Sequence, residues 1–426
     1  MTSNRNGPGR LSVGSWVTYD LANTIFALGV IGLYFPDWLK SMGQPDASLA
    51  LVEAGAGAIV IFLAPWAGAR SDIRGTRVPT LVVTTLVAVA ATATLASGPV
   101  VLSLVLLGAA LVAFNVGSVV YDALLVDVST PANRGWISGL GVGVGYLGSF
   151  IGLGLGLLTL DVLGWSYAAT FRVLALGFLV FALPAFFFID EREGDRDAKL
   201  PRLREVIGRL VSSWRLAADY NGVVRFLVGR FLYTDAINTL IGGFLTIFVI
   251  EELGLDRRFT TTLLGLAILA AVIGAFVAGR LVGRFGPLRV LRSVLVLWVL
   301  ALSSGVAAAV TGQTELAWAI GPLGGVALGA TWTADRVVMT RISPPRHLGE
   351  FYGLYATVGR FATILGPLTW ALIVDGLQLG RTVAMAALIG FVAIGWWVLR
   401  KVDDSERSWP AADLPIFSTV PDAPRQ

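Results

Sequence analysis

The sequence contains no cysteine and a single histidine, His347, in 426 residues. Without cysteine the chain cannot form a disulfide, a thiolate nucleophile or a cysteine-based metal site, and one histidine excludes a histidine cluster. A phosphate-binding loop for ATP ends in Gly-Lys-Ser/Thr, and none of the glycine-rich runs has that ending. We therefore expect no metal, no cofactor and no ATP-driven chemistry.

Charged residues are also scarce, at 14% of the chain against about 25% in soluble domains. Hydrophobic residues reach 55% and the mean hydropathy is +0.75, which indicates a membrane protein with several spans. A helix needs about 20 apolar residues to cross a bilayer. Runs of that length are expected at 15–36, 49–69, 78–97, 100–126, 136–160, 166–189, 223–250, 260–281, 290–310, 316–339, 351–374 and 382–399.

Only helices and closed barrels satisfy their backbone hydrogen bonds in lipid, and runs this long indicate helices. The sequence therefore predicts an all-α integral membrane protein with twelve transmembrane helices. The first run contains Asp20 and lacks a small-residue cleavage site, so we interpret it as a retained span rather than a signal peptide.

The basic residues are distributed unevenly over the loops between these runs. If the N-terminus is cytoplasmic, the outside loops hold only Lys40, Arg257, Arg258 and Arg381 of the 32 basic residues. Loops rich in Lys and Arg face the cytoplasm. We therefore predict a protein of the plasma membrane with both termini on the cytoplasmic side. Because the basic residues are sorted by side of the membrane, the net charge of +4 does not indicate nucleic-acid binding. No nucleic-acid partner is expected.

The order of the runs predicts two six-helix halves. We expect a cytoplasmic N-terminus at 1–14, a first half at 15–189, a cytoplasmic linker at 190–222, a second half at 223–400 and a disordered cytoplasmic tail at 401–426. Apolar residues recur at helical spacing between 200 and 214, which is typical of an amphipathic helix on a membrane surface.

A polar motif, Asp-x-x-Asn-Thr, occurs inside an apolar run of each half. It covers residues 20–24 and returns 215 positions later at 235–239. An acid in a span costs about 2.5–3.5 kcal/mol on insertion scales and is usually functional. Asp122 and Asp335 repeat at nearly the same offset. These landmarks indicate an internal duplication, a recurrent design in transporters with a central site.

Two loops at equivalent places in the halves resemble the signature loop of the major facilitator superfamily. In the loop after the second run, Gly68, Asp72, Gly75 and Arg77 match the signature, while Ile73 takes a position that is usually basic and Arg74 follows it. The copy after the eighth run keeps Gly279, Arg284 and Gly286, with Gly283 in place of the acid.

A narrower resemblance is to the UMF1 or Atg22-like branch of that superfamily. It rests on residues 19–23 and on the segment 121–148, where Asp122 replaces an expected Asn and Val126 an expected Pro. The resemblance implies a secondary transporter working by alternating access between two pseudo-symmetric halves. Fungal members are associated with amino-acid efflux from the vacuole. For bacterial-type relatives the resemblance does not indicate a particular substrate.

In this superfamily spans 1, 4, 7 and 10 line the central cavity. From this resemblance and from the residue types in the spans we predict three groups of functional residues in this chain. The predicted proton-coupling and cavity residues are Asp20, Asn23, Asp122, Asp235, Asn238 and Asp335. The predicted substrate-binding residues are Asn115, Tyr146, Trp332, Arg336 and Arg360. The predicted gating loop comprises Gly68, Asp72, Arg74, Gly75, Arg77, Gly279, Arg284 and Gly286.

Asp20 and Asp235 are expected to face each other across the cavity, with at least one of them coupling transport to protons. In an alternative interpretation the acids pair with Arg230, Arg336 or Arg360 and only lock helices together. Arg172 and Arg360 are open to both interpretations, because a guanidinium holds either a substrate anion or an acid of another helix. Glycines at regular spacing predict close helix packing; they are Gly141, Gly145, Gly148, Gly152 and Gly156.

The predicted function is secondary active transport of a small polar or zwitterionic metabolite, with amino acids as first choice, by a monomer that is not an enzyme. Its expected partners are the small-molecule substrate, protons and the lipid bilayer. Proton coupling is favoured because an acid in an apolar wall can exchange a proton near neutral pH. Export of amphipathic drugs or lipids is an alternative. A non-transporting receptor or an intramembrane enzyme is a remote one, since an enzyme here would have only carboxylate pairs for catalysis.

Overall fold

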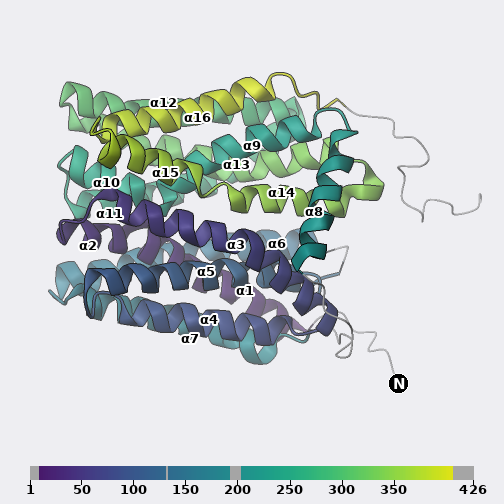
Figure 1. Ribbon diagram of the computed structural model, residues 1–426, viewed down its shortest axis with the longest axis horizontal. Helices are drawn as coiled ribbons and strands as arrows, with labels where there is room; N and C mark the ends of the chain where they lie inside the picture. Colours follow the sequence, from purple (N-terminus) through teal and green to yellow (C-terminus); the bar gives the residue numbers. More distant parts are fainter. Residues whose placement is uncertain (1–8, 131–132, 192–202, 406–426) are drawn as a thin grey trace, which may run out of the picture.

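The computed structural model describes residues 9–130, 133–191 and 203–405 (Figure 1). Residues 1–8 and 131–132, residues 192–202 of the predicted linker and residues 406–426 of the predicted tail lie outside these ranges. In the described part, long helices run side by side between two opposite ends of the molecule (Figure 1). The helices before and after α8 form the two groups that the hydropathy pattern predicts.

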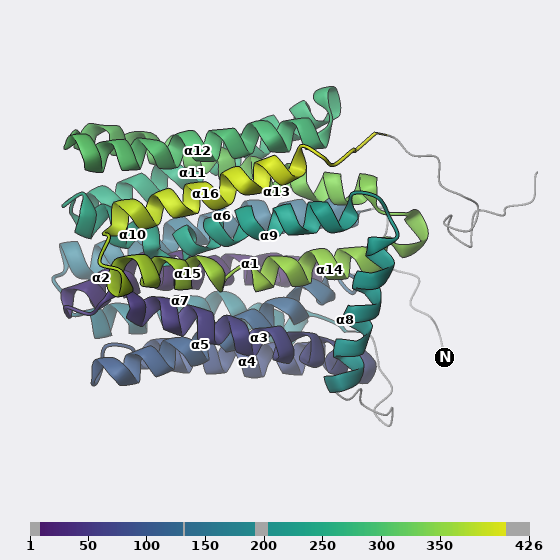
Figure 2. The ribbon, with the colours of Figure 1, turned by 45° about the horizontal axis from the view of Figure 1, so that its top comes forward.

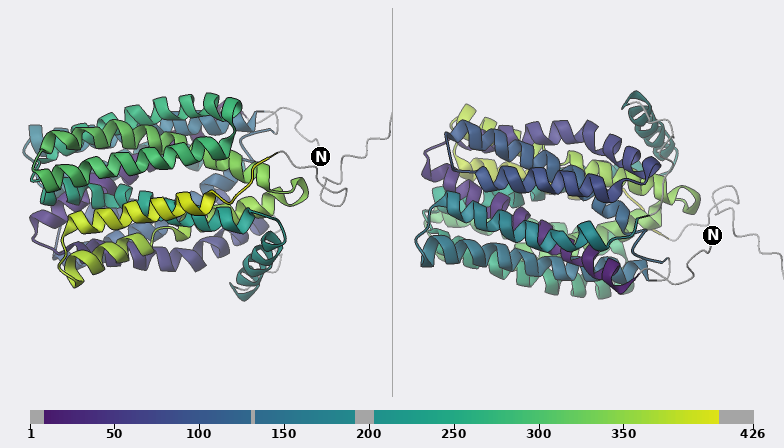
Figure 3. Two further views of the ribbon diagram at one scale, coloured as in Figure 1. Left: turned by 90° about the horizontal axis from the view of Figure 1, so that it is seen from above. Right: turned by 90° about the horizontal axis from the view of Figure 1, so that it is seen from below.

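The first group begins with α1 (Arg10–Thr24), which continues through a π-helical segment (Ile25–Tyr34) into α2 (Phe35–Ser41). The remaining elements are α3 (Asp46–Arg74), α4 (Arg77–Thr94), α5 (Val100–Leu124), α6 (Arg134–Gly156) with a π-helical extension (Leu157–Val162), and α7 (Tyr167–Phe188). The predicted linker contains α8 (Leu203–Ala218), which crosses one end of the bundle and lies to one side of it (Figures 1 and 3).

The second group begins with α9 (Val223–Thr239), which continues through a kinked π-helical segment (Leu240–Phe244), α10 (Leu245–Ile247) and a second π-helical segment (Phe248–Glu252). Then follow α11 (Arg257–Phe285), α12 (Pro287–Thr311), a short helix (Thr314–Ala319), α13 (Ile320–Ile342), another (Pro345–His347), α14 (Leu348–Phe361), α15 (Leu365–Ala371) with a π-helical end (Leu372–Gly376), and α16 (Arg381–Leu399).

Eleven helices in the described ranges are long and apolar enough to span a membrane. The predicted span 316–339 is not among these eleven, because its composition is too polar. It corresponds to α13, which is long enough at 23 residues but carries Asp335, Arg336 and Arg341. Since α13 packs against α11 and α12 inside the bundle, the twelve-helix prediction holds, and α13 is a polar member of the set.

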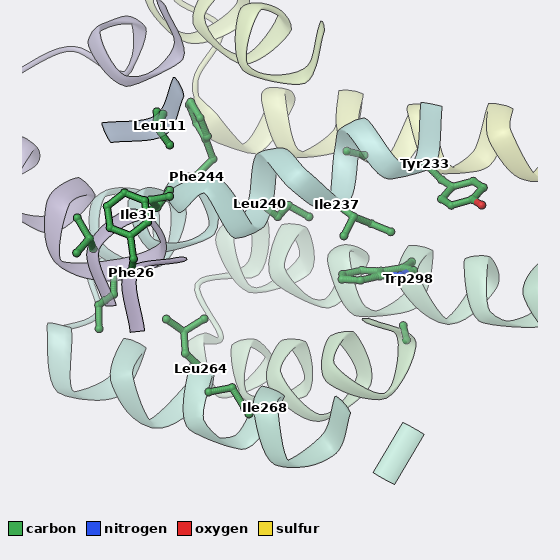
Figure 4. Close-up of a cluster of buried hydrophobic side chains, with 14 of the residues drawn as sticks. Phe26, Ile31, Leu111, Tyr233, Ile237, Leu240, Phe244, Leu264, Ile268 and Trp298 are labelled. Atoms are coloured by element: carbon green, nitrogen blue, oxygen red, sulfur yellow. The ribbon is translucent and has the colours of Figure 1, made fainter. Parts of the chain in front are cut away.

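The first and seventh spans lie at the centre of the bundle. In their most apolar stretches 67% and 72% of the residues are buried, whereas none of the other nine spans that are apolar enough to cross a membrane exceeds 39%. Figure 4 shows part of the surrounding core, where Ile237, Leu240 and Phe244 follow one another along the seventh span. The two halves meet where α3 packs against α14 and α15, and where α6 packs against α11.

The predicted glycine packing is confirmed between α1 and α6. A Cβ added at Gly148 would lie 2.0 Å from the carbonyl oxygen of Leu21, and one added at Gly145 would lie 2.6 Å from Oδ2 of Asp20. No side chain fits in such gaps, so only glycine allows α6 to approach the first span this closely.

The duplication also appears in a pair of contacts that the sequence analysis did not identify. Glu191, after the last helix of the first half, accepts a hydrogen bond from the backbone N–H of Val78 at 2.9 Å. Asp404, after the last helix of the second half, accepts one from Leu288 at 3.0 Å. In each half an acid thus satisfies a free backbone N–H at the start of the third span, where helices favour negative charge.

Candidate functional site

A cavity of about 250 Å³ lies between the two halves. Its polar lining comes from both of them and includes Glu53 of α3 and Asn115 of α5 from the first, and Asn238 of α9 and Arg360 of α14 from the second. Ala27 of the first span and several other small or apolar side chains complete the wall. The structure thus brings together three predicted residues and one that was not predicted.

Arg360 is the cation of this cavity, and its side chain is 26% exposed. Its Nη2 lies 3.2 Å from Oδ2 of Asp122 across the interface between the halves. The Asp122 side chain is 66% exposed and lies near the end of α5 that points toward α8 (Figure 2). Arg360 therefore both lines the cavity and pairs with an acid. This position is compatible with both of its predicted roles, substrate binding and pairing with an acid.

Glu53 is the acid that the sequence analysis missed. Within the described ranges it makes no ion pair and no side-chain hydrogen bond. A Cβ added at Gly242 would lie 2.5 Å from Oε1 of Glu53, so the carboxyl group lies against the backbone of the seventh span. Glu53 falls within the apolar run 49–69, and the rule that acids in spans are usually functional would have found it.

Asp235 has a structural partner in the break of the eleventh span. Its carboxylate accepts backbone hydrogen bonds from Ile364 at 3.1 Å and Gly366 at 2.5 Å. Pro367 lacks an N–H and would clash with the preceding turn of a continuous helix, which explains why α14 ends and α15 begins here. Since Asp235 is fully buried, it replaces the hydrogen bonds that the broken helix loses.

Asp335 is also fully buried and lies beside Arg230. Nε of Arg230 is 3.3 Å from Oδ2 of Asp335, and the hydroxyl groups of Tyr355 and Tyr233 donate to the same carboxylate at 2.9 and 3.4 Å. The guanidinium of Arg230 stacks over the ring of Tyr355 at 3.7 Å from its centroid. The interpretation that the acids pair with arginines therefore describes Asp335, and it describes Asp122 in part.

Asp20 has different surroundings from its repeat partner Asp235. It is half-buried on α1 beside Gly145 of α6 and forms no ion pair within the described ranges. Asn23 is buried on the same helix. Of the remaining predicted residues, Trp332 is half-buried and Arg336 is exposed.

Arg172 lies on the exposed side of α7, where it donates to Oγ of Ser97 at 3.3 Å. It does not line the central cavity, and it forms no ion pair with a described acid. In this conformation Arg172 thus lies outside the central cavity, with Ser97 as its hydrogen-bond partner.

A second, largely apolar cavity of about 230 Å³ adjoins the first. Ala27 and Ile241 line both cavities, so both spaces lie against the first and seventh spans. Its wall includes Tyr146, a predicted substrate residue, together with Leu264 and Trp298. The central region thus combines a charged compartment with an apolar one.

The end of the bundle that carries α2 and α10 (Figure 1) is held together by ion pairs between the halves. Arg257 of the second half binds Asp37 at 2.9 Å and Asp161 at 2.7 Å in the first. Arg381 of the second half binds Asp46 of the first at 2.9 Å. With Asp122 exposed toward the opposite end, the conformation is closed at the α2 end.

The predicted gating loop lies at the α8 end. Gly75 ends α3 with a φ of 59°, a left-handed conformation that glycine adopts without strain. Arg77 then begins α4 and pairs with the buried carboxylate of Asp127 at 2.6 Å, within the same half. The side chain of Asp72 lies outside the part of the chain that the structure describes.

Arg74 is the last residue of α3 in the first copy of this loop. In the second copy, Gly279 and Arg284 lie on α11, and Gly286, with a φ of 87°, joins α11 to α12.

Comparisons with known proteins agree with this architecture. A family described as "Vacuole effluxer Atg22 like" matches residues 125–410. An MFS-type transporter of Bacillus subtilis, YxiO, itself described as uncharacterized, is 26% identical over 94% of this chain and 98% of its own length. Autophagy-related protein 22-1 of Penicillium rubens is 25% identical over 64% of this chain, and the match spans 50% of the fungal protein.

Solved structures show the same fold at low sequence identity. The nucleoside transporter NupG superposes with a TM-score of 0.70 at 12% identity, covering 92% of this chain and 98% of that one. A bacterial homologue of the lysosomal transporter Spinster, in an inward-facing and occupied conformation, gives 0.64 at 17% identity, covering 94% and 98%. The helix arrangement, the duplicated halves and the family match together show that this chain belongs to the Atg22-like family and is a membrane transporter of the major facilitator type.

Proposed function

We propose that the chain is a secondary active transporter that moves a small polar or zwitterionic metabolite, with amino acids as first choice, using a proton gradient. The observation that carries this proposal is the central cavity, in which Glu53 and Arg360 supply opposite charges from opposite halves. A zwitterion offers a carboxylate for the guanidinium and an ammonium group for the carboxylate. No third charged side chain lines this cavity in the described part of the chain.

The size of the cavity favours a small substrate. At about 250 Å³ it lies below the ~300–1,000 Å³ typical of sites for drug-sized ligands. The adjoining apolar cavity of about 230 Å³ favours a second candidate, export of amphipathic compounds whose apolar part fills that space. Uptake assays with labelled amino acids and with a fluorescent amphipathic cation separate the two candidates.

Alternating access follows from a site between two halves that are joined at one end. The ion pairs of Arg257 and Arg381 hold the α2 end closed, and the gating loop at the α8 end holds that end closed in the opposite state. A cavity with walls from both halves is then reached from one side at a time.

We place both termini and α8 on the cytoplasmic side of the plasma membrane, as the distribution of basic residues favours. The described chain begins and ends at the same end of the bundle (Figure 1). We expect a tag after Gln426 to react with an impermeant probe only in opened cells, and a tag inserted near Gly43 to react in intact cells. Labelling of the C-terminal tag in intact cells would contradict this orientation.

The function is tested with purified protein in sealed liposomes and a mixture of radiolabelled zwitterionic amino acids. Wild type should accumulate label against its gradient when a pH gradient is imposed. Arg360→Ala should lower uptake at least about tenfold, because breaking one charged hydrogen-bonded contact to a ligand costs about 2–5 kcal/mol. Arg172→Ala, an exposed arginine outside the cavity, should transport normally.

Asp122→Asn separates substrate binding from the loss of the Asp122 pair. It should raise the substrate concentration needed for half-maximal uptake much less than Arg360→Ala does, because Arg360 keeps its charge. Equal losses in the two variants would reduce Arg360 to a structural partner of Asp122. Absence of uptake of every zwitterion by wild type would overturn the proposed function.

A further inference from the structure

Glu53 is an acid in the wall of a membrane-embedded cavity without a partner in the described part of the chain. It lies on α3 of the first half, and its carboxyl group touches the seventh span at Gly242 in the second half. The neighbouring span is irregular, since Gly243 has a φ of 110°. Glu53 is therefore a cavity acid that lies at an irregular junction between the halves.

The other charged groups around this cavity are already engaged. Asp235 on α9 accepts two backbone hydrogen bonds, and Arg360 on α14 pairs with Asp122 of α5. The polar groups that line the cavity from α5 and α9 are uncharged, and they include the amides of Asn115 and Asn238. Nothing described in the structure neutralises the carboxylate of Glu53.

An isolated carboxylate in a space of low dielectric constant is unstable unless it binds a proton or a cation. When the cavity is empty, a proton satisfies this requirement. When a zwitterionic substrate is bound, its ammonium group satisfies this requirement. The ammonium group and the proton compete for the same carboxylate oxygens. The two forms exclude each other.

We propose that Glu53 exchanges a proton for the ammonium group of the substrate, which makes the chain a proton/substrate antiporter. The protonated carboxyl group releases its proton as the ammonium group binds, and the resulting carboxylate forms a charged hydrogen bond with it. On the other side of the membrane the substrate leaves and a proton returns. An inward proton gradient then drives export of the substrate.

This inference rests on the proposed function and names the residue that couples it to protons. It differs from the prediction made for Asp20 and Asp235. Both carboxylate oxygens of Asp235 already accept backbone N–H groups, and Asp20 does not line the cavity that holds Arg360. Glu53 meets both requirements, a free carboxylate and a place beside the substrate.

The test measures proton release when substrate binds to the full-length protein in detergent. L-alanine, L-serine and L-leucine serve as probes, and titration calorimetry in phosphate and in Tris gives the number of protons released per substrate bound. Wild type should release about one proton per substrate. Glu53→Gln should release none and should show no gradient-driven accumulation in liposomes, while Glu53→Asp should retain proton release.

Two matched variants complete the design. Glu315→Gln, in the short helix before α13 and exposed, should behave as wild type. Asp20→Asn should also retain proton release if Glu53 is the exchanging group.

Three outcomes overturn the inference: proton release that persists in Glu53→Gln, proton release lost in Asp20→Asn but not in Glu53→Gln, or wild-type binding without proton release. The last measurement needs no variant, so the inference stays testable if Glu53→Gln does not fold. Each of these outcomes leaves the proposed function intact when wild type still transports the probes. Only the finding that wild type transports no zwitterion would overturn both the inference about Glu53 and the proposed function.

Discussion

Arg230→Met should strongly destabilise the protein, because it leaves the carboxylate of Asp335 buried without its cation. The side chains of Arg230 and Asp335 are 5% and 0% exposed. Removing one partner of a buried ion pair typically costs about 3–5 kcal/mol. Thermal unfolding of the purified variant, followed by circular dichroism, should show a clearly lower midpoint than wild type, with a smaller yield of monodisperse protein.

The double variant Arg230→Met with Asp335→Leu is the matched comparison. Replacing a buried pair by apolar residues of similar volume is often close to neutral, so the double variant should be more stable than Arg230→Met alone. The hydroxyl groups of Tyr233 and Tyr355 lose their acceptor in that variant, so full recovery is not expected. A double variant less stable than the single one would show that the pair does not act as a unit.

Arg257→Ala should open the α2 end of the bundle. Arg257 bridges two acids of the first half, and its side chain is only 23% exposed. Hydrogen bonds to charged groups contribute about 1.5–3 kcal/mol, and each 1.4 kcal/mol changes a two-state ratio about tenfold. The population open at the α2 end should therefore rise at least about tenfold.

The absence of cysteine makes this shift directly measurable. A single cysteine in place of Ala27, which lines both cavities, reports access from the α2 end to an impermeant maleimide. The labelling rate from that side should rise in Arg257→Ala. Arg258→Ala is the control, since the side chain of Arg258 is 70% exposed and 4.0 Å from Asp161.

An unchanged labelling rate in Arg257→Ala would mean that other contacts close this end on their own. The cluster of Arg381, Asp46 and Trp370 is the other candidate, because both Arg381 and Trp370 donate to Asp46. The double variant Arg257→Ala with Arg381→Ala should then show the higher rate of maleimide labelling from the α2 end.

Much of the fold followed from local sequence properties. Long apolar runs form helices in lipid, because a helix satisfies its own backbone hydrogen bonds. The number and order of the spans could therefore be predicted from these runs. The duplication was visible because Asp-x-x-Asn-Thr recurs at a nearly constant offset. The glycine stripe predicted close packing because spacing alone places Gly145 and Gly148 on one helix face.

The partners of the acids could not be predicted in the same way, because they depend on contacts between helices far apart in the chain. Asp20 and Asp235 have the same motif, yet Asp235 satisfies the break that Pro367 makes in the eleventh span and Asp20 lies against Gly145. Sequence identity of the two repeats says nothing of such surroundings.

Glu53 shows the limit most clearly. The sequence by itself determined that an acid stands in the second span, along with the helices and their pairing into halves. Only the tertiary structure decided that this acid shares a cavity with Arg360 while Asp335 and Asp235 are buried among other partners. The physical reason is that hydropathy and periodicity act within one helix, whereas the neutralisation of a buried charge is decided by whichever groups packing brings within hydrogen-bonding distance.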